Sequence, residues 1–252
     1  MSTVYQTILL EKEQGITRIV VNRPNVLNAM NRECLVEMKD ALQKAKRDRE
    51  TSIVVITGSG ERMFSVGADI KDLANLVRTR DRSGIQRFSK LFEDIFRTIE
   101  SMGKITVAAV NGPAIGAGAD LALSSDIRLL CQDAYFSYPE IRIGLVPPTF
   151  RLRAFIGKSL AKQFALSGHK LTAARACQMG LALEVFESDD FQQEVSKAVR
   201  SMSGIDCEII RTVKTAIRKG VGSDPAYHSP ERFFSEKFRI VLKDFLARSG
   251  RD

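Results

Sequence analysis

The sequence of 252 residues has few of the residues that metal sites and disulfide scaffolds require. It contains four cysteines and two histidines. The closest pair of cysteines, Cys177 and Cys207, is 30 residues apart (207 − 177). Because no CxxC pair or Cys/His cluster occurs, the spacing excludes a structural zinc site and a disulfide scaffold, and it predicts no metal site.

Long apolar runs are also absent. The longest uncharged stretch, from Ile105 to Ala119, is shorter than the roughly 20 residues that a membrane-spanning helix needs, and Asn111 to Pro113 interrupt it. Residues Met1 to Gln6 lack the charged start and apolar core of a secretory signal. We therefore expect no membrane contact and a cytoplasmic, reducing location.

The charge of the chain is strongly unbalanced. It has 38 lysines and arginines against 30 aspartates and glutamates, a formal net charge of +8, and its isoelectric point is about 9.4. Hydrophobic residues make up 44% and charged residues 27%, which is ordinary for a globular protein. The chain should attract an anion, and the charge alone does not say whether this is nucleic acid, acidic lipid or a phosphorylated small molecule.

Short β-rich runs alternate with helical patterns in the first third of the chain, which is typical of an α/β protein. A turn is expected at residues 13–15. Asn31 is the expected N-cap of a helix that ends near Lys46, and the three-and-four spacing of apolar residues from Phe88 to Ile99 predicts the clearest amphipathic helix. The expected strands cover residues 4–10, 16–21, 53–57, 107–110, 127–131, 135–137 and 183–186.

The pattern becomes entirely helical after Asp189. Residues 1–190 are therefore predicted to form the core, and residues 191–252 a helical C-terminal region. Its three short helices have apolar faces that would pack either on the core or on another subunit.

Two segments combine small residues with the end of a predicted strand. One runs from Asn111 to Leu123, and the other, from Phe64 to Lys71, follows the strand over 53–57. Small residues let a ligand approach backbone N–H groups closely, and two such segments could converge on one oxygen as an oxyanion hole. Small residues also permit close packing of a helix on a strand, so the pattern alone leaves both interpretations open.

Two carboxylates, Asp120 and Glu140, lie among apolar residues near these segments. Burial raises the pKa of a carboxyl group, which suits proton transfer near neutral pH, so the two form a candidate acid/base pair. Either one alone could instead be a helix cap or a salt-bridge partner. A Ser-His-Asp triad is not expected, because the G-x-S-x-G elbow is absent and His169 and His228 lie in polar contexts. Ser65 has no evident partner base.

Several short motifs follow one another along the chain in a characteristic order and spacing. They are Asn22 to Pro24, Asn28 to Met30, Gly67 to Lys71, Ala108 to Leu123, Ser125 to Arg128, Phe136 with Pro139 and Glu140, Gly144 to Pro147, and Leu166 to Leu181. In this order they resemble the enoyl-CoA hydratase/isomerase (crotonase) family. The resemblance covers nearly the whole chain, and it is more specific for the family than for one reaction.

The resemblance implies an α/β fold of the ClpP/crotonase type, a spiral of repeated ββα units followed by a helical trimerisation region. It implies a homotrimer, or a hexamer made of two trimers. The implied substrate is an acyl-CoA thioester, with no cofactor apart from the coenzyme A that the substrate carries. Its phosphates would supply the anion that the net charge favours, in preference to nucleic acid.

By position, the resemblance also implies roles for single residues. The backbone N–H groups of Ala68 and Ala117 would hold the thioester oxygen, and Asp120 and Glu140 would take the two catalytic carboxylate positions. The groove for coenzyme A would include Ala68, Asp69, Ile70, Lys71 and Ala117.

The chain departs from the family pattern at several places. Hydratases usually carry glutamate where this chain has Asp120, so the carboxyl is retracted by roughly one bond length, and a shift of about 1 Å can cost on the order of 10² in rate. Asp120 also resembles dienoyl-CoA isomerases, but those carry a further aspartate where this chain has Pro148. The usual Gly-Thr-Gln segment is replaced by Pro147 to Arg153, and Ala117 adds a methyl group near the thioester.

Enoyl-CoA hydratase is the leading hypothesis, and a double-bond isomerase that uses mainly Glu140 is the nearest alternative. A third hypothesis is RNA binding through basic clusters at residues 44–49 and 78–82, although no aromatic residues interleave them for base stacking. A fourth is a weakly active homologue that binds coenzyme A.

Overall fold

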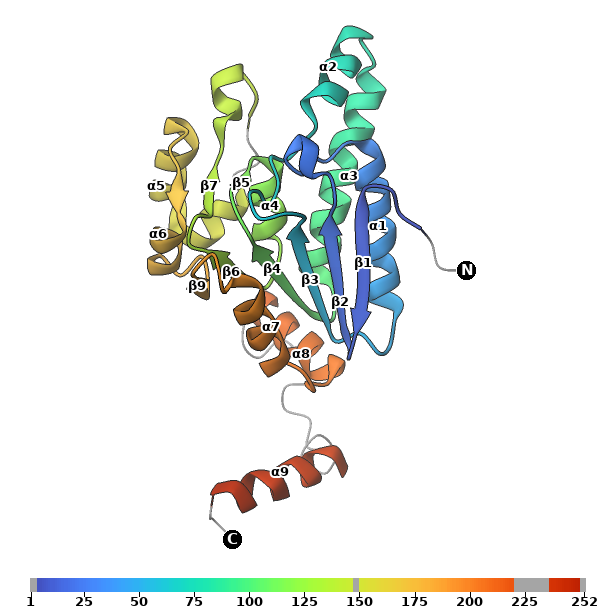
Figure 1. The fold of residues 1–252 in the computed structure, drawn as a ribbon, viewed down its shortest axis with the longest axis vertical. Coiled ribbons are helices and arrows are strands. Elements are labelled where there is room, and N and C mark those ends of the chain that lie inside the picture. Colours follow the sequence, from blue (N-terminus) through green and yellow to red (C-terminus); the bar gives the residue numbers. More distant parts are fainter. Residues whose placement is uncertain (1–3, 147–149, 220–235, 250–252) are drawn as a thin grey trace. The chain divides into compact units, whose positions relative to one another are not determined.

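The computed structural model describes residues 4–146, 150–219 and 236–249 (Figure 1). The contacts within the chain divide it into two units, Met1–Ile205 and Asp206–Asp252. Among the described residues, no helix is both long and apolar enough to cross a bilayer.

A six-stranded sheet forms the centre of the first unit (Figure 1). Its strands are β1 (Ile8–Glu13), β2 (Ile16–Val21), β3 (Ile53–Gly58), β4 (Ile105–Val110), β6 (Ile127–Cys131) and β9 (Glu184–Phe186). They are ordered β1-β2-β3-β4-β6-β9; β1 runs antiparallel to β2, and all other neighbours are parallel. All six residues of β3 are buried, as expected for a central parallel strand rich in valine and isoleucine.

Three short strands form a second, smaller sheet. It contains β5 (Ala114–Ile115), β7 (Tyr135–Ser137) and β8 (Leu171–Thr172), in the order β5-β7-β8. Single bridges between Met30 and Ala68 and between Ser65 and Ala114 extend the pattern. Successive parts of the chain thus give a strand to the large sheet, a short segment to the second layer, and then a helix. This repetition confirms the predicted spiral of ββα units.

Helices surround the two sheets. In the first unit they are η1 (Pro24–Val26), α1 (Arg32–Arg47), α2 (Ile70–Arg78), α3 (Arg82–Ser101), α4 (Ala117–Leu123), η2 (Pro139–Ile143), α5 (Phe150–Ser167), α6 (Ala173–Gln178) and α7 (Phe191–Ser201). The second unit contains α8 (Cys207–Lys219) and α9 (Glu236–Ser249). The predicted cap of α1 is confirmed, because the Asn31 side chain accepts a hydrogen bond from the Cys34 N–H at 2.9 Å.

The first strand differs from its prediction. It covers Ile8–Glu13 rather than residues 4–10, because the predicted turn fixes its pairing with β2: Ile8 lies opposite Val21 and Glu13 opposite Ile16. Of the six side chains in β1, only that of Ile8 is buried, so this edge strand accepts the charged residues that a hydrophobicity pattern assigns to a loop.

The boundary between the units also lies elsewhere than residue 190. Phe191, Val195 and Val199 of α7 are buried in the main hydrophobic core, so this helix belongs to the first unit, and the division follows Ile205. The helical region that begins at residue 191 therefore starts with a core helix.

The parallel strands end at one edge of the sheet, where the arrowheads of β2, β3 and β4 point in Figure 1. Ligands of open α/β sheets commonly bind at this edge. Two buried asparagines fasten the loops there. Asn111 Nδ2 donates to the Gly60 carbonyl at 2.7 Å, and Asn28 Nδ2 donates to the carbonyls of Ser59 at 3.0 Å and Met63 at 2.8 Å.

Asn28→Ala tests whether these loops depend on buried side-chain hydrogen bonds. Asn28 also accepts a bond from the Arg23 N–H at 3.1 Å, and its φ of +55° is one that asparagine tolerates better than alanine. We expect the free energy of unfolding in urea to fall by about 2–4 kcal/mol, at about 1 kcal/mol per bond and more for strain. Asn75→Ala, on the exposed side of α2, is the control, and an effect no larger than that of the control would contradict the role of Asn28.

Candidate active site

Asp120 lies in the first turn of α4, shortly after the chain leaves β4. Its side chain is fully buried, and neither carboxyl oxygen has a hydrogen-bond partner among the described residues. The Asp120 N–H donates to the Gly116 carbonyl at 3.1 Å, so helical backbone holds the residue in place. Burying a carboxyl group without a partner is unfavourable, which makes Asp120 a candidate for contact with a bound ligand.

The 3₁₀ helix η2 carries Glu140 against the start of α4. Strands β5 and β7 run parallel with Ile115 opposite Ser137, and the Gly116 N–H donates to the Ser137 carbonyl at 2.9 Å. A Cβ on Gly116 would lie 1.8 Å from Glu140 Oε1, so the carboxyl group occupies the space that a side chain there would need. Glu140 Oε2 is buried and has no partner among the described residues.

Ala68 and Ala117, the predicted N–H donors, lie where the segments that follow β3 and β4 touch each other. Gly67 has a φ of +84°, and a Cβ there would lie 2.9 Å from the Ala117 nitrogen. A Cβ on Gly118 would lie 2.4 Å from the Ser65 carbonyl oxygen. The two backbones therefore meet without an intervening side chain. Neither the Ala68 N–H nor the Ala117 N–H donates a hydrogen bond to another described group.

The predicted coenzyme A residues at the start of α2 divide into two kinds. The Asp69 carboxylate is already engaged, since it accepts a hydrogen bond from the Lys71 N–H at 3.0 Å and pairs with Arg23 at 2.8 Å. Burial alone would raise the pKa of Asp69, but these bonds lower it. Asp69 therefore caps α2, whereas Ile70 and Lys71 are exposed and accessible to a ligand.

Burial raises the pKa of both carboxyl groups. Removal from water raises the pKa of Asp120 to about 8; the charge of Arg151 opposes this shift and that of Glu140 adds to it. Burial also raises the pKa of Glu140, which is less deeply buried. Asp120 consequently holds its proton at neutral pH, and Glu140 is the better candidate for the ionised partner.

Two residues beside Asp120 did not emerge from the sequence. The Tyr138 side chain is 1% exposed, and its hydroxyl has no hydrogen-bond partner among the described residues. Arg151 is also buried, and its Nε donates to Glu100 Oε1 at 2.6 Å. The period-two spacing of Phe136 and Tyr138 could have placed the tyrosine inside, whereas nothing in the sequence links Arg151 to a partner 51 residues away.

Among the described residues, the other candidate catalytic and metal-binding side chains do not form a site. Ser65 Oγ donates to the Asn28 carbonyl at 2.8 Å and accepts from the Gly67 N–H at 3.0 Å, so its role is structural. His169 is exposed, and His228 lies outside the described residues. Within the described ranges, no group of three or more His, Cys, Asp or Glu side chains is placed to hold a metal ion.

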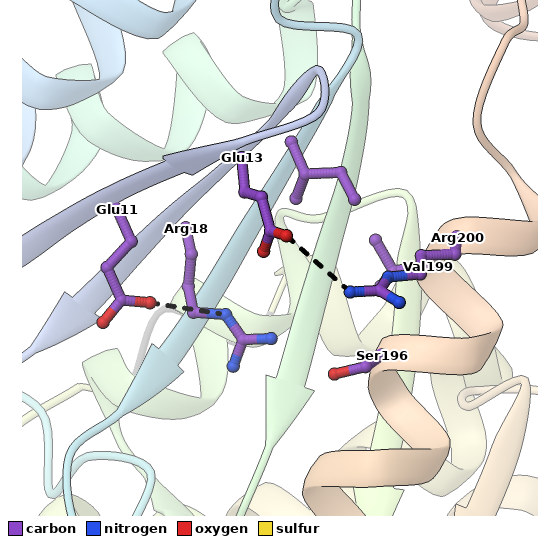
Figure 2. Close-up of a pocket in the computed structure, with 7 residues that line it drawn as sticks. Glu11, Glu13, Arg18, Ser196, Val199 and Arg200 are labelled. Carbon is purple, nitrogen blue, oxygen red and sulfur yellow. Dashed lines mark ion pairs between the residues drawn. The ribbon is translucent and has the colours of Figure 1, made fainter.

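A small pocket of about 80 Å³ lies at the opposite edge of the sheet, between the turn of β1 and β2 and helix α7 (Figure 2). It is lined by Glu11, Glu13, Ile16, Arg18, Ser196, Val199 and Arg200. Its charged groups pair with one another, because Glu11–Arg18 and Glu13–Arg200 are ion pairs of 3.9 Å (Figure 2). The pocket contains none of the predicted site residues.

Known proteins are similar to this chain in sequence and in fold. Crotonyl-CoA hydratase of Syntrophomonas wolfei is 34% identical over 223 residues, which cover 87% of this chain and 84% of that protein. The mitochondrial Delta(3,5)-Delta(2,4)-dienoyl-CoA isomerase of Pongo abelii is 34% identical over 198 residues, 74% of this chain and 60% of that protein. The crystal structure of an enoyl-CoA hydratase from Bacillus anthracis superposes with a TM-score of 0.84 at 23% identity, over 95% of this chain and 97% of that one, which shows the shared fold.

The family model of enoyl-CoA hydratase/isomerase matches residues 11–230. This range includes both small-residue segments, both buried carboxyl groups and nearly all strands and helices of the first unit. The chain therefore belongs to the enoyl-CoA hydratase/isomerase family.

Proposed function

We propose that the protein is an enoyl-CoA hydratase, which adds water reversibly to a 2-enoyl-CoA to give a 3-hydroxyacyl-CoA. The observation that carries the proposal is the meeting of two unpartnered backbone donors with two carboxyl groups whose pKa values burial raises. Relatives named crotonyl-CoA hydratase and short-chain-enoyl-CoA hydratase, 34% and 32% identical to this chain, support it.

The Ala68 and Ala117 N–H groups would hold the thioester oxygen. During hydration the electron pair of the C2–C3 double bond moves onto that oxygen, giving an enolate-like species. Donors fixed toward this negative charge stabilise the transition state more than the ground state, and each can be worth on the order of 10²–10³ in rate. Backbone donors on two packed segments need little rearrangement as the charge develops.

The two carboxyl groups would divide the proton transfers. We assign the base to Glu140, which takes a proton from water while the water oxygen bonds to C3. Asp120, protonated at neutral pH, gives its proton to C2 as the enolate collapses. Return of the proton from Glu140 to Asp120 through solvent then restores the starting state.

Coenzyme A supplies the anionic part of the substrate. Its phosphates suit a chain of net charge +8, and the exposed Lys71 beside Ala68 places a positive charge near the thioester. We expect Asp69 to act indirectly in this groove, by holding the start of α2 through Arg23.

Assembly and location also belong to this proposal. In α8, Ile209, Val213 and Ile217 are exposed, and in α9, Phe238, Ile240 and Leu242 are exposed. Exposed apolar side chains on helices favour contact with another subunit, so we propose a homotrimer or a dimer of trimers. None of the four cysteines, all of which lie in the described ranges, forms a disulfide bond, which fits the proposed cytoplasmic location.

A double-bond isomerase is the second candidate. A dienoyl-CoA isomerase relative is 34% identical, and the side chain of Asp120 is shorter than the glutamate usual in hydratases. An isomerase would use Glu140 to move one proton between two carbons and would add no water. Pro148, where such dienoyl isomerases carry aspartate, lies outside the described residues. Because proline has no carboxyl group, this residue weighs against that particular reaction.

RNA binding ranks lower. Of the basic residues at 44–49, Lys44 already forms an ion pair with Asp40 at 2.7 Å. A gel shift that coenzyme A fails to compete would favour RNA as the ligand.

Glu140→Gln and Asp120→Asn test the carboxyl pair, because each keeps the side-chain size and removes proton transfer. We expect kcat with crotonyl-CoA, followed by loss of the conjugated thioester absorbance, to fall at least about 10²-fold in each. Glu184→Gln, an exposed acid of β9, is the control. Full activity of both variants would disprove the assignment.

Two other outcomes would favour the alternative functions. Conversion of a 3-enoyl-CoA without incorporation of labelled solvent oxygen would favour the isomerase. Tight binding of coenzyme A without turnover would favour a weakly active homologue.

The pH dependence follows from the raised pKa of Asp120. We expect kcat/KM to fall as pH rises through about 8, where Asp120 loses its proton.

The same shift predicts how stability depends on pH. The unfolded chain loses the Asp120 proton near pH 4, so the folded state binds more protons between about pH 4 and 8. The free energy of unfolding therefore decreases as pH rises across that window. Urea unfolding at about pH 5 and pH 8 measures this decrease in the free energy of unfolding. In Asp120→Asn, the part of the decrease that Asp120 causes should vanish. A decrease as large as in the wild type would show that Asp120 is ionised in the folded protein.

Gly118→Ala tests the oxyanion donors, which cannot be removed by side-chain substitution. The added Cβ would lie 2.4 Å from the Ser65 carbonyl and push the segments carrying Ala68 and Ala117 apart. We expect kcat to fall at least about 10²-fold, with helical circular dichroism retained because alanine favours helix. Wild-type kcat in a folded Gly118→Ala protein would contradict an oxyanion hole at this contact.

A further inference from the structure

Tyr138 occupies a defined place at the candidate active site. It directly follows β7 and precedes the first residue of η2. Because Ile115 pairs with Ser137 in the parallel β5–β7 ladder, Tyr138 continues the register opposite Gly116, the residue against which the Glu140 carboxyl lies. The backbone therefore places Tyr138 at the start of η2 and opposite the start of α4, the two elements that carry the carboxyl groups.

Packing accounts for the ring of Tyr138 but not for its hydroxyl. Tyr138 and Phe136 are each 1% exposed and belong to the hydrophobic core. Phenylalanine would fill the same space without burying a polar atom. A buried hydroxyl with no partner is unfavourable, so its presence indicates a partner that is bound during function.

The titratable groups around this hydroxyl come from three elements. After burial, which is the main cause, the charges of Asp120 on α4 and Glu140 on η2 raise the pKa of Tyr138, while Arg151 on α5 opposes them. Arg151 is in turn paired with Glu100 of α3 at 2.6 Å. Tyr138 is therefore a neutral phenol, able to donate one hydrogen bond and to accept others.

Three unpartnered polar groups thus meet in one buried place. The Tyr138 hydroxyl, both oxygens of Asp120 and Oε2 of Glu140 have no hydrogen-bond partner among the described residues, so none of them bonds directly to another. A single oxygen that bridged the three groups would give each of them a partner, as bridging waters do for other buried polar groups.

We propose that the Tyr138 hydroxyl is a third polar group of the active site and binds the oxygen that is added to, or removed from, C3 of the substrate. This inference rests on the proposed hydratase function. The reacting water donates one O–H to Glu140 and the other to the phenol oxygen, which leaves a lone pair directed at C3. In the reverse reaction, the 3-hydroxyl group of the substrate donates its O–H to the same phenol oxygen as the C3–O bond breaks and Glu140 returns its proton to the departing oxygen.

Tyr138→Phe removes only the hydroxyl. We expect kcat/KM to fall about ten-fold in both directions, which corresponds to one hydrogen bond of about 1.4 kcal/mol. The KM for the 3-hydroxyacyl-CoA should rise several-fold, while the KM for the 2-enoyl-CoA stays the same. Only the 3-hydroxyacyl-CoA carries the C3 oxygen that Tyr138 binds. The urea midpoint should be unchanged or higher. Tyr135→Phe, three residues earlier at the first position of β7, where the ring centroid lies 4.2 Å from Lys170 Nζ, is the matched control and should leave all values unchanged.

A double variant separates direct contact from a packing effect. If Tyr138 and Glu140 bind the same water, Tyr138→Phe should reduce the rate less in a Glu140→Gln background than in the wild type. Wild-type kinetics of Tyr138→Phe, or equal losses in both backgrounds together with a lower urea midpoint, would overturn the inference. If the wild-type protein hydrates no 2-enoyl-CoA, the proposed function itself fails, a result distinct from an active wild type with an unaffected Tyr138→Phe variant.

Discussion

The direct backbone contact between the segments that follow β3 and β4 is the constraint on which the candidate site depends. Gly67 and Gly118 provide it, because a Cβ on either would overlap the facing backbone. A spiral of ββα units naturally brings successive strand ends to one edge, but side chains would ordinarily hold the following segments apart. Without this contact, Ala68 and Ala117 would lie on separated segments, and the oxyanion hole that we propose could not form.

Burial then determines the chemistry of the groups that this contact brings together. A carboxyl group that loses water without gaining a partner holds its proton more tightly, and Asp120, the more deeply buried of the pair, shifts further than an ordinary surface acid. Glu140 lies against the backbone at Gly116 and is partly exposed. Two residues of similar intrinsic acidity are thereby buried to different depths, which favours the division into acid and base that we propose.

Much of the fold follows from local sequence, whereas its long-range details do not. Strands β2 and β6 have the predicted bounds, because segments rich in β-branched or apolar residues mark strands of the sheet. The predicted bounds of β1 were wrong because an edge strand carries exposed charges. Helix α7 belongs to the core, although its sequence pattern resembles those of the later helices. In the site, sequence reasoning found Asp120 and Glu140 as acids among apolar residues. It missed the engagement of Asp69 by Arg23, 46 residues away, and the unpartnered Tyr138 hydroxyl, since both depend on contacts that only the folded chain creates.

The crystal structure of the protein with a bound 3-hydroxyacyl-CoA tests the central claim most directly. The thioester oxygen should lie about 2.7–3.1 Å from the nitrogens of both Ala68 and Ala117, with the 3-hydroxyl oxygen within hydrogen-bond distance of Glu140 and C2 facing Asp120. A thioester oxygen bound away from both N–H groups, or an acyl chain that avoids the two carboxyl groups, would contradict the proposed hydratase site.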